Sequence, residues 1–201
     1  VSQVTSAVLK LARAMQDNIA PESEVAAFGE RFAAWLGPIA AEASGGRSVK
    51  LQEWTNRQAV LPVLVDLAIQ FQAAKRARGF IEFADQIRFA LDIITAHPQV
   101  ADGYRQRYRA VLLDEYQDTS VVQTRFFQQL FAGSPVMAVG DPDQSIYGFR
   151  GASASNLLDF PGQFGAGEPF TLSRSWRNPT SVLDAANAIS TPLHAQFPFD
   201  K

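Results

Sequence analysis

The sequence contains no cysteine, no long apolar run and no strong excess of charge of either sign. The absence of cysteine excludes a disulfide scaffold and a thiolate metal site, and it fits a reducing compartment. No apolar run approaches the roughly 20 residues that a membrane-spanning helix needs, and the first residues lack the pattern of a signal peptide. We therefore expect a cytoplasmic protein that makes no contact with a membrane.

The charges are unevenly distributed, although the formal net charge is only −2. Residues 71–110 carry more Lys and Arg than Asp and Glu, whereas residues 111–168 are clearly acidic. An acidic centre beside a basic flank suits a site that holds a cation and handles phosphates. Each of these charges taken alone is better explained as part of a solvated helix face.

The chain has 201 residues, of which 47% are hydrophobic and 19% charged, so it is long and apolar enough to bury a core. Its first part is predicted to be helical, because apolar residues recur at three- and four-residue spacing in residues 4–16 and 23–36. Residues 61–78 and 79–94 predict two further helices. Residues 42–48 are rich in Gly and Ser, and we expect them to form a loop.

The pattern changes near residue 109, where short strand-like runs begin to alternate with helical stretches. The strand-like runs are residues 110–115, 135–141 and 169–175, and the helical stretches are residues 120–131, 153–160 and 178–190. This alternation is typical of a parallel sheet that helices cover on its faces. We therefore predict an all-helical region over residues 1–79 and an α/β region over residues 80–201.

Polar side chains follow each of the three strand-like runs. They are Asp114 and Glu115 after the first run, Asp141 and Gln144 after the second, and Arg174 and Arg177 after the third. In open parallel sheets, functional residues gather at the carboxyl ends of the strands. Carboxylates, an amide and arginines would then meet at one edge of one sheet, although a single acidic strand end is often only a helix cap or an ion pair.

Three segments of this region resemble motifs of a known family. The strings LLDEYQDTS (residues 112–120), VGDPDQSIYGFRGA (139–152) and LSRSWRNP (172–179) are similar to motifs II, III and IV of the UvrD/Rep-type superfamily 1 DNA helicases, in that family's order and spacing. FIEFADQI, residues 80–87, resembles the segment that precedes motif II in that family. The resemblance covers residues 80–190.

The resemblance implies a fold and an activity. Residues 80–201 would form part of a RecA-like P-loop NTPase domain, and residues 1–79 the end of a helical, 1B-like insertion. The full-length parent would be an ATP-dependent motor that moves 3′ to 5′ on single-stranded DNA and unwinds duplex DNA, in repair or recombination.

The same resemblance implies a site for ATP and Mg²⁺. Asp114 matches the aspartate that holds Mg²⁺, and Glu115 matches the residue that orients the attacking water. Gln144 matches the glutamine that contacts the γ-phosphate. Arg177 matches the arginine that neutralises charge on the transferring phosphoryl group. Trp176 lies where the family commonly has a tyrosine beside the adenine.

A DNA-binding group is implied as well. Tyr147, Phe149 and Arg150 match the group that meets single-stranded DNA, where aromatic rings stack on bases and arginine pairs with phosphate. Phe149 replaces the tryptophan that is usual in the family. Without the surrounding string, Tyr147 and Phe149 would be interpreted as a core aromatic pair. Gln117 and Asp118 are expected to tie the first strand end to the second by hydrogen bonds.

The phosphate-binding loop of such a site is missing from the sequence. No G-x-x-x-x-G-K-[ST] string occurs, and EASGGRSVK (residues 42–50) lacks the required spacing. The family places this loop before the helical insertion, and a second RecA-like domain after the part that is similar here. We therefore expect an internal fragment of a larger helicase that does not hydrolyse ATP by itself.

Two other functions stay open at this point. The chain could be a non-catalytic module that binds nucleic acid or a protein partner and keeps the motor fold, although the intact Glu115, Gln144 and Arg177 argue against this. It could also contain a metal-dependent nuclease site, built on Asp114, Glu115, Asp118 and Asp141. That site would leave Gln144 and Arg177 unexplained. The sequence does not identify a protein partner.

Overall fold

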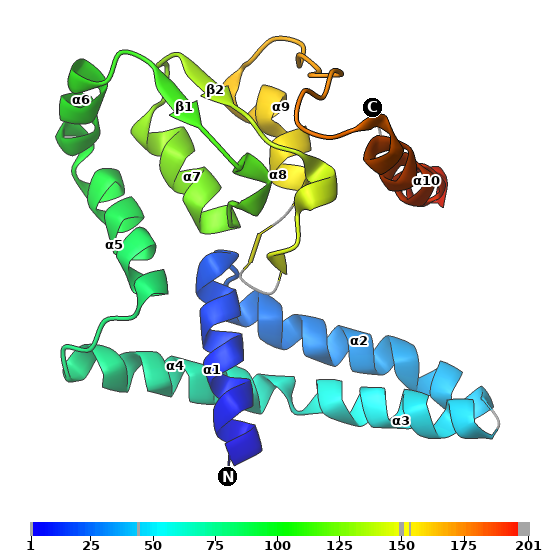
Figure 1. The fold of residues 1–201 in the computed structure, drawn as a ribbon. Helices are drawn as coiled ribbons and strands as arrows, with labels where there is room; N and C mark the ends of the chain where they lie inside the picture. Colours follow the sequence, from blue (N-terminus) through cyan, green and yellow to red (C-terminus); the bar gives the residue numbers. More distant parts are fainter. Residues whose placement is uncertain (1, 44, 149–150, 153, 197–201) are drawn as a thin grey trace.

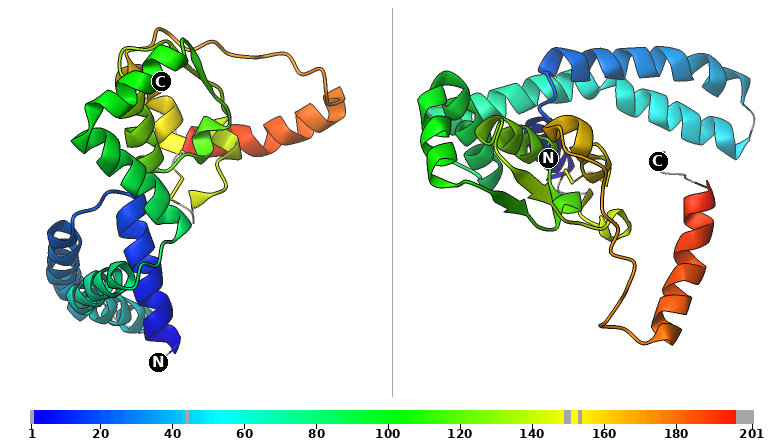
Figure 2. Two further views of the ribbon diagram at one scale, coloured as in Figure 1. Left: turned by 90° about the vertical axis from the view of Figure 1, so that its left-hand side faces the viewer. Right: turned by 90° about the horizontal axis from the view of Figure 1, so that it is seen from above.

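The structure is a computed structural model that describes residues 2–43, 45–148, 151–152 and 154–196. Figure 1 shows a helical arm joined to an α/β unit, and the turned views of Figure 2 show that the arm lies to one side of the sheet. No helix in these ranges is both long and apolar enough to span a membrane. Over these residues the fold is mostly helical, with one small parallel sheet.

The arm consists of four helices. They are α1 (Ser2–Asp17), α2 (Glu22–Glu42), α3 (Gly46–Ala59) and α4 (Leu61–Ala77). Helices α2 and α3 form an antiparallel pair, and α1 crosses α4 (Figure 1). Val8 and Ala12 of α1 pack against Ala68 of α4 at the centre of this crossing. The helices predicted over residues 4–16, 23–36 and 61–78 are confirmed.

The loop predicted over residues 42–48 is shorter than expected, because α3 begins at Gly46. This helix was not predicted: its sequence is polar and has no clear apolar stripe, and none of its described residues is buried. It follows Gly45, whose φ of 64° favours glycine. Helix α3 owes its place to packing against α2 rather than to a pattern of its own.

Helices α5 (Phe83–Ala96) and α6 (Pro98–Arg107) connect the arm to the sheet. The helix predicted over residues 79–94 is confirmed with a later start, since a capping box formed by Glu82 and Asp85 fixes the first turn of α5. Helix α6 was not predicted. Its buried face consists of little more than Ala101, which gives no helical periodicity to find.

The sheet has two parallel strands in the described ranges, β1 (Val111–Leu113) and β2 (Val136–Ala138), with Val111 opposite Val136. Helix α7 (Val121–Leu130) connects them and packs against α5. One core joins Leu91 and Ile94 of α5 to α7 and to the inner side of both strands. The two 3₁₀ turns η1 (Tyr116–Asp118) and η2 (Pro142–Gln144) follow β1 and β2 closely. The first two strands and the helix between them were predicted correctly.

The third predicted strand, residues 169–175, is wrong. After α8 (Ala154–Leu158) and α9 (Phe160–Phe164), the chain leads away from the sheet as an irregular segment to α10 (Thr180–Gln196), as Figures 1 and 2 show. Phe170 and Leu172 are 98% and 90% exposed. Alternating apolar residues form a strand only beside a partner edge, and within the described residues this segment has none.

Candidate functional site

The chain turns sharply where β1 ends, and this turn presents Asp114 and Glu115 to solvent. The backbone of Glu115 is left-handed, with φ 50° and ψ 41°. That conformation costs a residue with a Cβ atom about 1–2 kcal/mol. The N–H of Glu115 donates to Asp114 Oδ1 (3.0 Å), and the N–H of Tyr116 donates to the carbonyl of Val139 beyond β2 (3.0 Å). The two carboxylates therefore lie on a strained turn that is anchored beside the second strand.

Gln117 fills the space between the two strand ends. It is buried, its Nε2 donates to Glu115 Oε2 (2.7 Å), and its Oε1 accepts a hydrogen bond from the N–H of Asp141 (3.0 Å). Its backbone carbonyl accepts a hydrogen bond from the Ser145 hydroxyl (3.2 Å). The predicted tie between the strand ends is confirmed for Gln117. For Asp118 the tie stays a prediction: its Oδ1 is buried without a hydrogen-bond partner among the described residues.

Gly140 lets the second loop pass closely over Gln117. A Cβ atom at position 140 would lie 2.3 Å from Gln117 Oε1 and 3.3 Å from the Gln117 backbone nitrogen. The first distance is far shorter than a van der Waals contact, and the buried amide is held at both ends. A residue with a side chain at position 140 would thus displace the link between the strands.

The end of β2 carries the second predicted group of the site. Asp141 Oδ1 accepts a hydrogen bond from the N–H of Asp143 (3.0 Å), and its Oδ2 accepts one from Gln144 Nε2 (2.9 Å). Gln144 is exposed. Because β1 and β2 are parallel neighbours, Asp114, Glu115 and Gln144 reach the same edge of the sheet. We call Asp114, Glu115, Gln117, Asp141 and Gln144 the strand-end site.

The turn after β1 is supported from behind. Tyr116 is fully buried and meets Phe160 edge to face, with 5.3 Å between ring centroids, and burial raises the pKa of its hydroxyl. Ser120 caps the N-terminus of α7. Asn156 Nδ2 donates to the carbonyl of Thr119 (2.8 Å) and so fastens α8 to the turn. The exposed carboxylates thus have a rigid base.

The arginine and tryptophan predicted for the same site lie elsewhere. Trp176 is 83% exposed, and the Arg174 guanidinium stacks on its ring at 4.4 Å from the centroid. Arg177 is exposed in the same segment. Across the described ranges, no hydrogen bond or ion pair joins Arg177 to Glu115 or Gln144. The expected convergence of three strand ends therefore holds for two of them.

The predicted DNA-binding group is only partly described. Tyr147 lies in the loop after η2 and is partly exposed. Phe149 and Arg150 lie outside the described residues. The strand-end site and Tyr147 are close in sequence, since η2 ends at Gln144.

Asp114 is suited to a single hydrated cation. It is exposed, and one of its carboxylate oxygens accepts the N–H of Glu115. Mg²⁺ keeps several waters and is usually bound by only one or two carboxylates together with phosphates, so one aspartate at a strand end fits it. In the part of the chain that the structure describes, no three His, Cys, Asp or Glu side chains are grouped to hold a metal. The four carboxylates considered for a nuclease thus form no such cluster.

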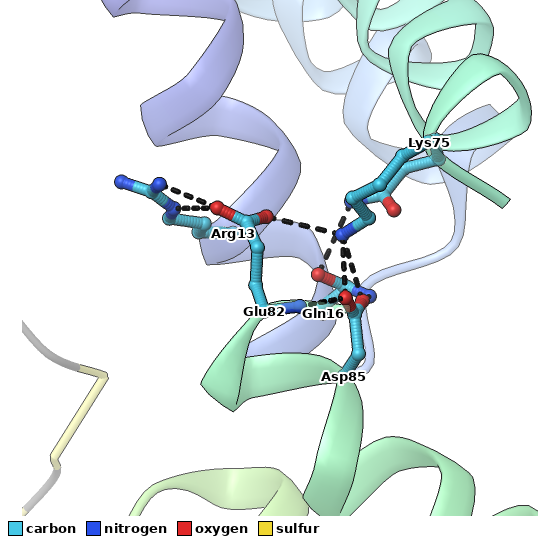
Figure 3. Close-up of polar contacts among 6 residues, drawn as sticks. Arg13, Gln16, Lys75, Glu82 and Asp85 are labelled. Carbon is cyan, nitrogen blue, oxygen red and sulfur yellow. Dashed lines mark hydrogen bonds and ion pairs between the residues drawn. The ribbon is translucent and has the colours of Figure 1, made fainter. Parts of the chain in front are cut away.

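A second polar centre, which the sequence analysis missed, lies where α1, α4 and α5 meet (Figure 3). Lys75 and Asp85 are both buried and form an ion pair of 2.7 Å. Lys75 Nζ also donates to Glu82 Oε2 (3.0 Å), and Arg13 donates twice to Glu82 Oε1 (3.1 and 2.5 Å). Gln16 Nε2 donates to Asp85 Oδ1 (2.7 Å). We call these five residues the Lys75 cluster.

Both carboxyl groups of the Lys75 cluster are held in the charged form. The hydrogen bond from Arg13, with that from Lys75, holds the pKa of Glu82 below its usual value. Burial alone would raise the pKa of Asp85, but hydrogen bonds from Lys75, Gln16 and the Glu82 backbone outweigh it and lower the pKa. One signal was present in the sequence: Lys75 lies about two turns after the buried Ala68 on the same face of α4. A cation in an apolar stripe needs a buried partner.

One family model and several known proteins are similar to this chain. The family model described as the UvrD/REP helicase N-terminal domain matches residues 38–165. The chain belongs to this family. The match includes both strands of the sheet and the second half of the arm, which the resemblance of the motifs alone did not reach. It stops before Trp176 and Arg177.

Several relatives are similar over about 60% of the chain. DNA helicase II of Escherichia coli (strain K12) is 37% identical over 121 residues, which cover 59% of this chain and 17% of that protein. ATP-dependent DNA helicase UvrD1 of Mycobacterium bovis is 37% identical over 128 residues, covering 60% and 17%. UvrD1 of Mycobacterium leprae is 36% identical over 131 residues, again covering 60% and 17%. The chain thus spans less than a fifth of the length of these relatives.

Proposed function

We propose that this chain is part of an ATP-dependent DNA helicase that moves 3′ to 5′ on single-stranded DNA and unwinds duplex DNA, in repair or recombination. One observation carries the proposal: in a chain of the UvrD/REP family, parallel pairing of β1 and β2 brings Asp114, Glu115 and Gln144 to one edge of the sheet. The similar proteins are named as DNA helicases. Because the chain spans a small part of them, we assign the activity to a longer protein that contains these residues.

The strand-end residues would divide the chemistry among them. Asp114 would hold Mg²⁺ through its exposed carboxylate. Glu115, fixed by Gln117, would orient the water that attacks the γ-phosphate of ATP, and Gln144 would contact that phosphate. When bound, Mg²⁺ would supply the positive charge that Asp114 faces, and ATP would supply the phosphoryl group that is transferred. A strained, rigidly supported turn suits this task, since strain of this kind is typical of functional sites.

Arg177 and Trp176 complete the proposed ATP site only if their segment moves. Arg177 would neutralise charge on the phosphoryl group, and Trp176 would stack on adenine. Both side chains are exposed, and Trp176 is already stacked by Arg174. The exposed segment is consistent with a part that reaches its place when the rest of the longer protein is present.

Single-stranded DNA would bind beside the strand-end site. Tyr147 is partly exposed in the loop after η2, and its ring can stack on a base without reading sequence. We propose that Phe149 adds a second ring and Arg150 a phosphate contact. Attachment of these residues to the loop that contains Gln144 would link the ATP and DNA sites.

The two strands are proposed to belong to a larger, RecA-like sheet. Parallel sheets are normally covered on both faces. Here α7 covers one face, whereas Leu112 and Met137 are 76% and 55% exposed. We propose that further strands and helices of the longer protein cover these residues. In this interpretation residues 80–201 belong to the motor domain and residues 1–79 to a 1B-like insertion.

The 201-residue chain alone is proposed to be inactive towards ATP. It contains no G-x-x-x-x-G-K-[ST] string, and the lysine and backbone N–H groups of that loop normally hold the phosphates. We propose that another part of the longer protein supplies them and that the whole works in the cytoplasm. Mg²⁺-dependent ATP hydrolysis by the purified 201-residue chain would contradict this assignment.

The test is a Glu115→Gln substitution in the longer protein, which keeps the shape of the side chain and removes its charge. We expect ATP hydrolysis stimulated by single-stranded DNA to fall about 100-fold or more, with DNA binding retained. Glu168→Gln is the matched control, because Glu168 is exposed and outside the site. Unchanged hydrolysis in Glu115→Gln would remove Glu115 from its role. A wild-type protein that binds DNA but hydrolyses no ATP would instead be a non-catalytic binding module.

A further inference from the structure

We propose that Gln117 is a positioning residue that couples the phosphate-contacting Gln144 to the water-orienting Glu115. The inference rests on the proposed function, because it assigns Gln117 a task in that reaction. Its basis is a continuous chain of hydrogen bonds. From Gln144 Nε2 the chain runs to Asp141 Oδ2, from the N–H of Asp141 to Gln117 Oε1, and from Gln117 Nε2 to Glu115 Oε2.

Each link of this chain is short and well defined. The three donor–acceptor distances are 2.9, 3.0 and 2.7 Å, from the phosphate-contacting end to the water-orienting end. The middle of the chain is buried and both of its ends are exposed. A buried amide whose donor and acceptor are both used cannot turn without breaking one bond and leaving a polar atom unsatisfied. The orientation of Gln117 therefore depends on both strand ends.

The surroundings leave this series of hydrogen bonds little freedom to rearrange. The Ser145 hydroxyl holds the backbone carbonyl of Gln117, and the Gly140 backbone lies so close that a Cβ atom there would overlap Oε1. Glu115 is fixed at its backbone by the strained turn. A displacement of the loop that carries Gln144 is thus transmitted to the Glu115 carboxylate rather than absorbed by a mobile side chain.

Position 117 requires an amide, because its side chain must donate to Glu115 and accept from the N–H of Asp141. Gln117→Glu keeps the size of the side chain and an acceptor for the Asp141 N–H, but it replaces the donor to Glu115 by a second carboxylate. Gln117→Met keeps the approximate volume and removes both hydrogen bonds. Asp141→Ala breaks the chain at its other end, because it releases Gln144 and leaves every buried side chain unchanged.

The experiment measures DNA-stimulated ATP hydrolysis by the longer protein carrying each variant. In all three, we expect kcat to fall about 10- to 100-fold, as for other residues that orient a reacting group through one contact. We expect KM for ATP and affinity for single-stranded DNA to stay within about twofold, since only the alignment of the reacting groups is lost. Gln129→Met is the control: it also removes a glutamine side-chain hydrogen bond, to Thr95, but far along α7 from the site.

The double variant Gln117→Glu/Asp141→Ala tests whether the two residues act as one unit. If they do, kcat of the double variant should be no lower than that of the single variant with the lower kcat. Independent roles would multiply the two losses. Multiplied losses, or single variants with kcat within about twofold of wild type, would overturn the coupling while Glu115→Gln still abolished hydrolysis. If Gln117 variants unfold, Asp141→Ala alone decides: normal kcat contradicts the inference. Absence of DNA-stimulated hydrolysis in the wild type would instead defeat the proposed function.

Discussion

The Lys75 cluster and the strand-end site are both built from charged and amide side chains, yet they are opposite in design. In the Lys75 cluster, two cations face two carboxylates, and Lys75 and Asp85 are buried. In the strand-end site, Asp114 and Glu115 are exposed and form no ion pair with any described residue. The first arrangement is electrostatically complete, and the second leaves its negative charge unbalanced.

The difference shows what each centre contributes. A closed, paired network fixes the orientation of the elements that supply it, here α1, α4 and α5. An open group of carboxylates on a rigid turn stabilises little, and in the proposed function it would face a bound cation. We therefore expect substitutions in the Lys75 cluster to change stability, and substitutions in the strand-end site to change activity. The predictions below test this division.

The largest effect is expected for Lys75→Met. The change leaves the Asp85 carboxylate buried without its cation, and breaking a buried pair in this way costs about 3–5 kcal/mol in the free energy of unfolding. Urea unfolding of the 201-residue chain, followed by circular dichroism and tryptophan fluorescence, measures it. Lys10→Met is the matched control, since Lys10 is exposed on α1.

A double variant separates pairing from packing. In Lys75→Met/Asp85→Leu both charges are replaced by apolar groups, and we expect most of the lost stability to return, because no buried charge is left unpaired. A Lys75→Met loss below about 1 kcal/mol would show that the cluster is solvated rather than closed.

Gly140→Ala is expected to have an intermediate effect, and it tests how tightly the strand-end site is packed. The new Cβ atom would overlap Gln117 Oε1, so the buried amide or the loop must shift, at a cost of about 1–3 kcal/mol. Thermal unfolding measures the loss. Gly103→Ala is a control of opposite sign: nothing outside its own helix lies within 4 Å of its Cβ position in α6, and we expect a gain of about 0.5–1 kcal/mol. Equal effects of the two substitutions would contradict the tight contact at Gly140.

Sequence patterns predicted the strand pair well because local signals and tertiary contacts agree there. The aliphatic runs of β1 and β2 are short and bounded by acids or glycine, and Ser120 gives α7 a capping box. The same signals failed at residues 169–175, where alternation alone could not supply a neighbouring strand. Helix α3 had the reverse problem, because packing against α2 forms it without a pattern of its own.

The candidate site was likewise predictable only where the pairing of the strands sets the positions of the side chains. Parallel pairing brings Asp114, Glu115 and Gln144 to one edge, as strand-end reasoning expected. The bonds of Gln117 followed from the same proximity. Arg177 depended on the missing third strand and lies apart. The Lys75 cluster joins side chains of three helices, and its contacts between Arg13 and Glu82 connect residues far apart in the sequence. No local pattern contains such a contact.

The pH dependence of stability is expected to show the smallest effect, and it again separates the two centres. Glu82 and Asp85 have pKa values below the ordinary 4.5 and 3.8, since Arg13 and Lys75 donate to Glu82, and hydrogen bonds to Asp85 outweigh its burial. The unfolded chain therefore takes up protons more readily than the folded one. The stability that these groups contribute is complete above pH 4.5 and is lost as the pH falls through their folded pKa values. Urea unfolding at a series of pH values below neutrality should show this loss.

The test compares variants with the wild type, because a single pH profile of the free energy of unfolding also contains Asp17. Burial raises the pKa of Asp17, which acts in the opposite sense. Glu82→Gln should reduce the loss of unfolding free energy at acidic pH. Glu22 is an exposed acid on α2, and Glu22→Gln should leave this loss unchanged. An equal loss of unfolding free energy at acidic pH in both variants would show that Glu82 does not cause it. The Lys75 cluster would then contribute no acid-sensitive stability through Glu82.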